Sequence, residues 1–170
     1  MLPLNSRWGA IALVVAAFTL TSGCASSRRD AYLQDKAAVH VYRQPISEVW
    51  LKAKELLSEE GYSVMEAKGG YELQTDWLMQ GAPSSLGTSY ARYLVRGAEK
   101  GPGQATVAFH RQVRVQSQAA HDTSTGGSAA GSGTDSNSFG RDHAIEWQLI
   151  QRVDAETAKA WEAEATQKVK

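Results

Sequence analysis

The sequence is poor in cysteine, in net charge and in long apolar runs, and each shortage excludes a class of protein. One cysteine in 170 residues cannot form a disulfide within the chain, so a disulfide scaffold is excluded. The 18 basic and 18 acidic residues balance and leave no basic field to displace counterions from nucleic acid. No apolar run reaches the roughly 20 residues of a transmembrane helix. We therefore expect no nucleic-acid partner and one modest core that is stable through burial alone.

The motifs of enzyme chemistry are missing as well. The chain has no GxSxG, no HExxH and no phosphate-binding loop that follows a strand and ends in Lys-Ser/Thr. His40, His110, His121 and His143 lie in separate segments, so no metal-ligand cluster is visible. His143 has Glu146 at i+3, but at the start of a predicted helix we expect the pair to be surface decoration. The sequence predicts no enzyme, no cofactor and no metal.

The first residues are typical of an export signal. Arg7 precedes an uncharged apolar run over residues 8–20, and the small residues 21–23 stand directly before Cys24. This layout resembles the lipobox of bacterial lipoproteins, which implies cleavage before Cys24 and lipid attachment at its thiol. An ordinary secretory signal with an incidental cysteine is the alternative. We expect residues 1–23 to be a signal peptide and Cys24 to be the membrane anchor.

The rest of the chain divides into a tether, a domain and an insertion. Residues 24–36 are small, polar and charged, which predicts a lipid-anchored tether. Because no Asp follows Cys24, the sorting rule for lipoproteins favours the outer membrane, with the domain facing the periplasm. Residues 37–166 are predicted to form one α+β domain. Within it, residues 117–140 are rich in Gly, Ser and Thr and are predicted to be disordered.

The periodicity of the domain predicts a β-α-β-β-β-β-α order. Val39 and Val41 alternate with polar residues as a short first strand. A helix follows with one apolar face, between Pro45 as its first residue and Gly61 as its stop; its apolar residues are Ile46, Val49, Trp50, Ala53, Leu56 and Leu57. Four strands are predicted over residues 62–67, 71–79, 88–96 and 105–116, and a helix over residues 142–165. This is an antiparallel sheet of about five strands with two helices on one face.

The last two strands predict one apolar and one wet sheet face. If Val95 pairs with Val107, Tyr93 faces Phe109, and both lie on the apolar face. Arg111 interrupts that face, and we expect a bulge or an edge position there.

Two features of this domain suggest interactions. A row of polar residues on the wet face is either a docking surface for an acidic partner or lipid headgroup, or a solvated face balanced by Glu72 and Asp76; the row is Arg92, Arg96, His110 and Arg114. Trp161 lies on a helix whose apolar residues cover more than one stripe, which suggests a partner or a second copy. Trp50 and Trp77 fit the core periodicity and are predicted to pack inside.

A family resemblance follows from these segments. The lipobox precedes PISEVWLKAKELL, EEGYSV, GYELQTDW and RYLVRG, and this layout is similar to the helix-grip domains of the BamC family of outer-membrane lipoproteins. The resemblance implies an accessory or scaffold role in outer-membrane protein assembly, with an envelope protein as partner. Because helix-grip folds can hold an apolar ligand between helix and sheet, a lipid or small-molecule binder is the alternative.

Overall fold

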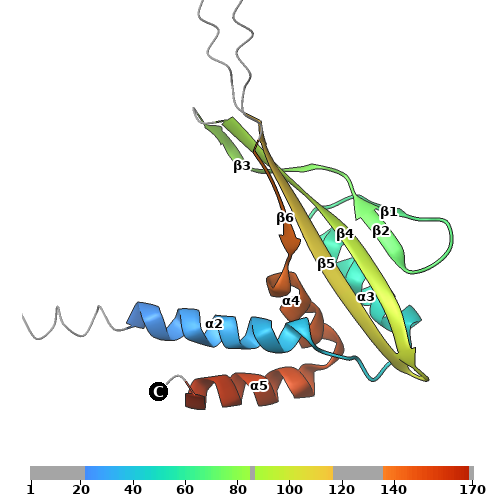
Figure 1. The fold of residues 1–170 in the computed structure, drawn as a ribbon, viewed down its shortest axis with the longest axis vertical. Helices are drawn as coiled ribbons and strands as arrows, with labels where there is room; N and C mark the ends of the chain where they lie inside the picture. The colour runs from blue at the N-terminus through green and yellow to red at the C-terminus, as the bar shows by residue number, and fades with distance from the viewer. Residues whose placement is uncertain (1–21, 85–86, 117–135, 169–170) are drawn as a thin grey trace, which may run out of the picture.

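The computed structural model describes residues 22–84, 87–116 and 136–168, and it has an α+β fold, as predicted (Figure 1). Its described part holds an antiparallel sheet with helices on one face. The helices are α2 (Ser22–Ala38), α3 (Ile46–Glu59), α4 (His143–Val153) and α5 (Ala155–Lys168). The strands are β1 (Val64–Glu66), β2 (Glu72–Thr75), β3 (Leu78–Ser84), β4 (Gly87–Gly101), β5 (Gln104–Gln116) and β6 (Ser136–Arg141). None of these helices is both long and apolar enough to cross a membrane.

The long β4–β5 hairpin forms the spine of the sheet. The strand order is β1-β2-β4-β5-β6, and β3 also pairs with β4. The strand predicted over residues 71–79 is therefore wrong as one unit, because it divides into β2 and β3 along the same edge of β4. The division follows Thr75, whose side-chain oxygen accepts a hydrogen bond from the Tyr93 N–H at 2.9 Å. A side chain thus takes the place of a backbone acceptor where the strand breaks.

The predicted register of the hairpin is wrong by two residues, although the predicted faces are correct. Val95 lies opposite Phe109, and Tyr93 lies opposite Arg111. Because side chains alternate with a period of two, a shift of two residues keeps each side chain on its face. The strands continue to Gly101 and Gln104 around a shorter turn than the sequence suggested. Arg111 lies neither at a bulge nor at an edge; its Nη2 donates to Gln80 Oε1 at 3.2 Å.

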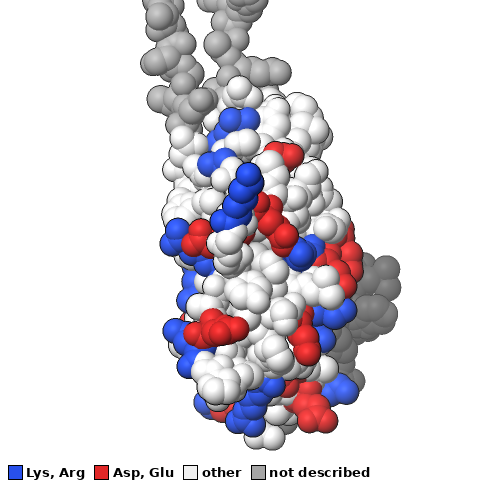
Figure 2. All heavy atoms as spheres, turned by 90° about the vertical axis from the view of Figure 1, so that its right-hand side faces the viewer, with Lys and Arg blue, Asp and Glu red and all other residues white. Residues whose placement is uncertain are grey.

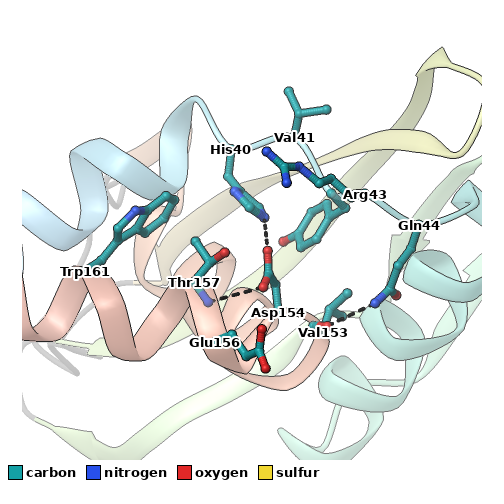
Figure 3. Close-up of a pocket in the computed structure, with 10 residues that line it drawn as sticks. His40, Val41, Arg43, Gln44, Val153, Asp154, Glu156, Thr157 and Trp161 are labelled. Atoms are coloured by element: carbon teal, nitrogen blue, oxygen red, sulfur yellow. Dashed lines mark hydrogen bonds and ion pairs between the residues drawn. The ribbon is translucent and has the colours of Figure 1, made fainter.

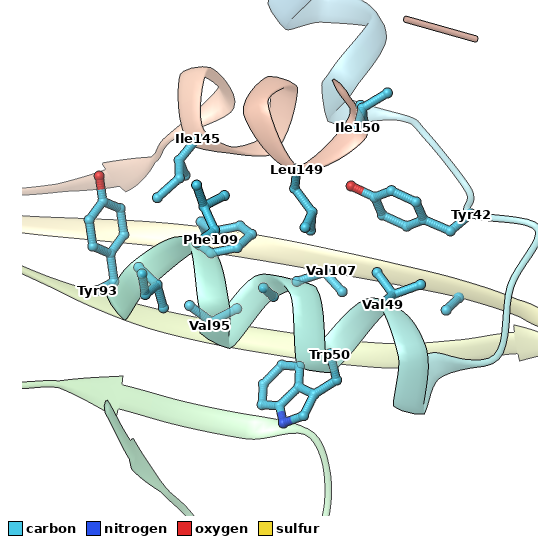
Figure 4. Packing of buried hydrophobic residues seen from close by; sticks show 14 of the residues in the cluster. Tyr42, Val49, Trp50, Tyr93, Val95, Val107, Phe109, Ile145, Leu149 and Ile150 are labelled. Carbon is cyan, nitrogen blue, oxygen red and sulfur yellow. The ribbon is translucent and has the colours of Figure 1, made fainter. Parts of the chain in front are cut away.

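Helix α3 confirms the predicted apolar face, and its six apolar residues are all buried. It packs with α4 on one face of β4 and β5 (Figure 4). Pro45 is the N-cap rather than the first helical residue. Gly61, at a φ of 87°, ends the helix as predicted. The shared core contains Val49, Leu56, Val95, Phe109, Leu149 and Ile150, each at most 1% exposed.

Helix α2 replaces the irregular tether predicted over residues 24–36. The segment has no Pro, and after Gly23 it is made largely of helix-forming residues. Leu33 and Ala37, one turn apart, are buried where α2 contacts α4 and α5. Figure 1 shows α2 beside α5 on the side of the molecule away from β1 and β2. The backbone of Cys24 belongs to this helix, whereas its side chain and residues 1–21 lie outside the described part.

Three more boundaries differ from the prediction. The first strand reduces to a single bridge between Tyr42 and Ala105, while Val39 and Val41 are exposed. Of the tract 117–140, predicted to be disordered, residues 136–140 belong to β6 and pair with β5, and residues 117–135 lie outside the description. The C-terminal helix divides at Asp154, whose Oδ1 accepts a hydrogen bond from the Thr157 N–H at 3.2 Å and so caps α5.

Candidate functional site

The structure separates the four predicted surface residues into three groups on the open face of the sheet, which no described helix covers. Arg96 is 74% exposed and forms an ion pair with Glu72, with Nε and Oε1 3.2 Å apart, as the solvated-face reading predicted. The ring of His110 stacks on Phe139 of β6 at 5.5 Å. Arg92 and Arg114 come together elsewhere on this face, against the ring of Trp77.

A single indole joins Arg92 and Arg114. Their guanidinium carbons lie 4.7 and 4.4 Å from the centre of the Trp77 ring, and Arg114 also lies 5.1 Å from the Tyr90 ring. The prediction that Trp77 packs in the core is wrong, because it is half-buried and outside the core. We call Trp77, Tyr90, Arg92 and Arg114 the Trp77 cluster. Sequence reasoning assigned Trp77 by continuing the alternation of β2 through the strand break.

The positive charge of the Trp77 cluster has no counter-ion nearby in the part of the chain that the structure describes. Among the described residues, no carboxylate lies within ion-pair distance of Arg92 or Arg114. Arg92 Nε donates instead to the neutral Gln112 Oε1 at 2.8 Å. Figure 2 shows basic and acidic residues interspersed on the side of the molecule away from α2 and α5.

A second candidate is a surface pocket of about 530 Å³ between the α2–α3 connection and the α4–α5 junction (Figure 3). His40 Nε2 lies 3.6 Å from Asp154 Oδ2, and its ring meets Tyr42 and Trp161 edge-on at 4.6 and 5.3 Å. Gln44 Nε2 donates to the Val153 carbonyl at 3.1 Å. Burial lowers the pKa of His40 despite the carboxylate of Asp154.

The contacts of this pocket are those of a structural junction. In the described part of the chain, His40 makes no hydrogen bond to a hydroxyl or thiol, so the His40–Asp154 pair lacks the nucleophile of a hydrolytic triad. The Trp161 ring, half-buried, also stacks with Trp147 at 6.2 Å and lies 5.8 Å from Lys36 Nζ. These contacts hold α5 to α2 and α4. A role for Trp161 toward a partner stays a prediction.

The prediction that His143 and Glu146 form a pair of surface residues is wrong for Glu146. It is 1% exposed and accepts hydrogen bonds from the Phe109 N–H at 3.0 Å and Arg141 Nε at 2.7 Å. Its other oxygen lies 3.1 Å from His143 Nδ1. The carboxylate therefore joins α4 to β5 and β6. The i+3 spacing to His143 was visible in the sequence, but the partners from β5 and β6 were not.

The described residues show no group of three or more His, Cys, Asp or Glu side chains that could hold a metal ion. Comparison with known proteins does not assign the site either: no protein-family model, curated protein or solved structure matches the chain. Of the two candidates, the Trp77 cluster is therefore better supported by its geometry than the pocket at His40.

Proposed function

We propose that the protein is a non-catalytic lipoprotein of the cell envelope, an accessory or scaffold in outer-membrane protein assembly. In this proposal, lipid on Cys24 holds it at the outer membrane with its domain in the periplasm, and the open face of the sheet docks an envelope protein. The Trp77 cluster carries the proposal, because Trp, Tyr and Arg are the residue types enriched at the centres of protein interfaces. Anchoring raises the local concentration of the domain, so weak contacts suffice.

The alternative, a ligand held between helix and sheet, gains no support from the core. Side chains fill the space between α3, α4 and the described strands (Figure 4). Val49, Phe109 and Leu149 are fully buried there. A lipid would have to displace close-packed side chains, which is costly in a protein interior. We therefore place the function on the outer surface of the sheet.

Photo-crosslinking in intact cells tests the docking face. We would introduce benzoylphenylalanine at Tyr90, within the Trp77 cluster, and, as a matched control, at the exposed Lys159 of α5. Crosslinks from position 90 to barrel-assembly components, absent from position 159, would support the proposal. Crosslinks from position 159 alone would place docking elsewhere, and no partner from either position would contradict the scaffold role.

The anchor has its own test. Because Cys24 holds the thiol that would be acylated, Cys24→Ser is expected to abolish metabolic labelling with palmitate and to release the chain from membranes. Ser27→Cys in the Cys24→Ser background is the matched control, because it restores a thiol at a position that the lipobox does not specify. Continued labelling of Cys24→Ser would overturn the lipoprotein proposal.

A further inference from the structure

We infer that the Trp77 cluster binds an acidic peptide segment of a partner protein, whose carboxylates pair with the guanidinium groups of Arg92 and Arg114. The inference rests on the proposed function and names the chemistry of the partner. It begins from the lack of a counter-ion. A half-buried cation has lost part of its hydration, so an unpaired one retains a strong capacity to bind an anion.

Pairing elsewhere in the domain shows how unusual these two arginines are. The half-buried lysines of the described part, Lys36 and Lys54, both have carboxylate partners, at 3.8 and 2.7 Å. The half-buried cations without one are Arg92, Arg111 and Arg114. Arg111 belongs to the helix-covered face and donates to Gln80. Within the described ranges, only the open face holds two half-buried guanidinium groups that lack a carboxylate partner and lie together.

The two guanidinium groups are already held in place. Both lie over the ring of Trp77. Arg92 also donates a hydrogen bond to Gln112, and Arg114 also contacts the ring of Tyr90. Fixing them in the free protein reduces the side-chain entropy that binding would otherwise cost. A planar guanidinium also suits the bidentate geometry of a carboxylate. The surface is therefore organised for carboxylates before a partner arrives.

The distance between the two guanidinium groups limits how far apart the carboxylates that they bind can lie. The guanidinium carbons of Arg92 and Arg114 lie within about 9 Å of each other, the sum of their distances to the Trp77 ring centre. Along an extended strand, side chains at i and i+2 share one face and lie about 7 Å apart. Acidic residues at alternate positions of an extended segment fit within this limit and present both carboxylates on one face. Adjacent acidic residues point to opposite faces.

A peptide fits this cluster better than a membrane surface does. Recognition of anionic lipid by charge uses clusters of about 4–8 Lys or Arg residues. The Trp77 cluster has two, combined with two aromatic rings. This composition is typical of the centre of a protein interface.

Fluorescence anisotropy with the full lipidated chain in non-ionic detergent tests the inference. The probe is a fluorescein-labelled peptide of four Glu-Thr repeats, and its control is a peptide of equal composition with the four Glu residues in one block. Arg92→Gln and Arg114→Gln are each expected to weaken binding of the alternating peptide roughly tenfold, as the loss of a charge-assisted hydrogen bond implies. Arg96→Gln, on the same face but paired with Glu72, is expected to change it less than twofold.

The inference would be overturned by no binding of the alternating peptide, by equal binding to the chain and its Arg92→Gln/Arg114→Gln double variant, or by equal binding of both peptides. Tighter binding to phosphatidylglycerol than to phosphatidylcholine vesicles, lost in the double variant and seen without peptide binding, would assign the cluster to lipid phosphate instead. Far-UV circular dichroism checks that the variants fold. If the double variant retains the crosslink from position 90, the acidic site is wrong while the scaffold role stands. If the chain without the arginine substitutions gives no crosslinked partner from position 90 or position 159, the scaffold role itself is contradicted.

Discussion

The replacement of Glu146 by Ala should be among the most destabilising single changes in this domain. It would leave the buried Phe109 N–H without an acceptor, which costs about 1–3 kcal/mol. It would also break the pair with Arg141, and losing one partner of a buried ion pair costs about 3–5 kcal/mol. Arg141 is 36% exposed at its side chain, so water can replace part of that pairing. We therefore expect a total loss of about 3–4 kcal/mol of unfolding free energy, at or just below the low end of the combined effects.

Urea unfolding followed by tryptophan fluorescence measures this loss. With a slope of about 1–3 kcal/mol per molar urea, the midpoint should fall by about 1–4 M. Glu146→Gln keeps an acceptor for Phe109 and should lose about 1–2 kcal/mol. Gln148→Ala, an exposed change on the same helix, should stay within about 0.5 kcal/mol. If Glu146→Ala shifts the midpoint no more than Gln148→Ala, the carboxylate does not join α4 to the sheet as described.

Three further changes test other parts of the fold. Gly97→Ala should lower the free energy of unfolding in urea by about 1–3 kcal/mol, because a Cβ there would lie 2.9 Å from both Ile46 Cδ1 and Tyr71 Cβ. Gly140→Ala is its control, because a Cβ there meets nothing within 4 Å. Equal losses in the two variants would refute the close contact at Gly97. Leu33→Ala should lower the free energy of unfolding by about 2–3 kcal/mol and expose α2 to protease. Leu51→Ala, at a residue of α3 that is 52% exposed, should do neither. If Leu33→Ala leaves α2 protected, the docking of α2 does not depend on the Leu33 contact. His40 has a pKa below its usual 6.5, so the unfolded chain takes up its proton first, and the melting temperature should fall as the pH drops below about 6.5. His40→Gln should flatten the dependence of the melting temperature on pH between pH 8 and 5. If the variant shows the same dependence as the unmodified chain, groups other than His40 cause it.

Helix α3 shows what the sequence could predict. Its apolar residues recur at helical spacing, and the interval between Pro45 and Gly61 bounds it on both sides. Local pattern and burial agree there, so the face was correct residue by residue. The two faces of the β4–β5 hairpin were predictable for the same reason, because alternation survives an error of two residues in register.

Features that depend on distant segments were not predictable. The break after Thr75 depends on a hydrogen bond to Tyr93, eighteen residues away, and the misplacement of Trp77 followed from it. Glu146 is buried because its partners come from β5 and β6. For α2, the polar composition predicted a tether, while the few residues that bury it, Leu33 and Ala37, carry too weak a pattern to reveal a docked helix.

The helical form of α2 changes how the proposed anchor would work. At a rise of about 1.5 Å per residue, nine residues from Cys24 to Leu33 span about 14 Å, and Leu33 is buried in the domain. A flexible tether of this length would let the domain sample many orientations, whereas a docked helix restricts them. Because α2 packs on α4 and α5, the anchor would join the domain on its helix side. The open face with the Trp77 cluster lies on the other side of the sheet. A short, stiff link of this kind would keep that face clear of the anchor and turned toward a partner. Such a link raises the effective concentration of the domain at the partner only if its length and direction fit the complex.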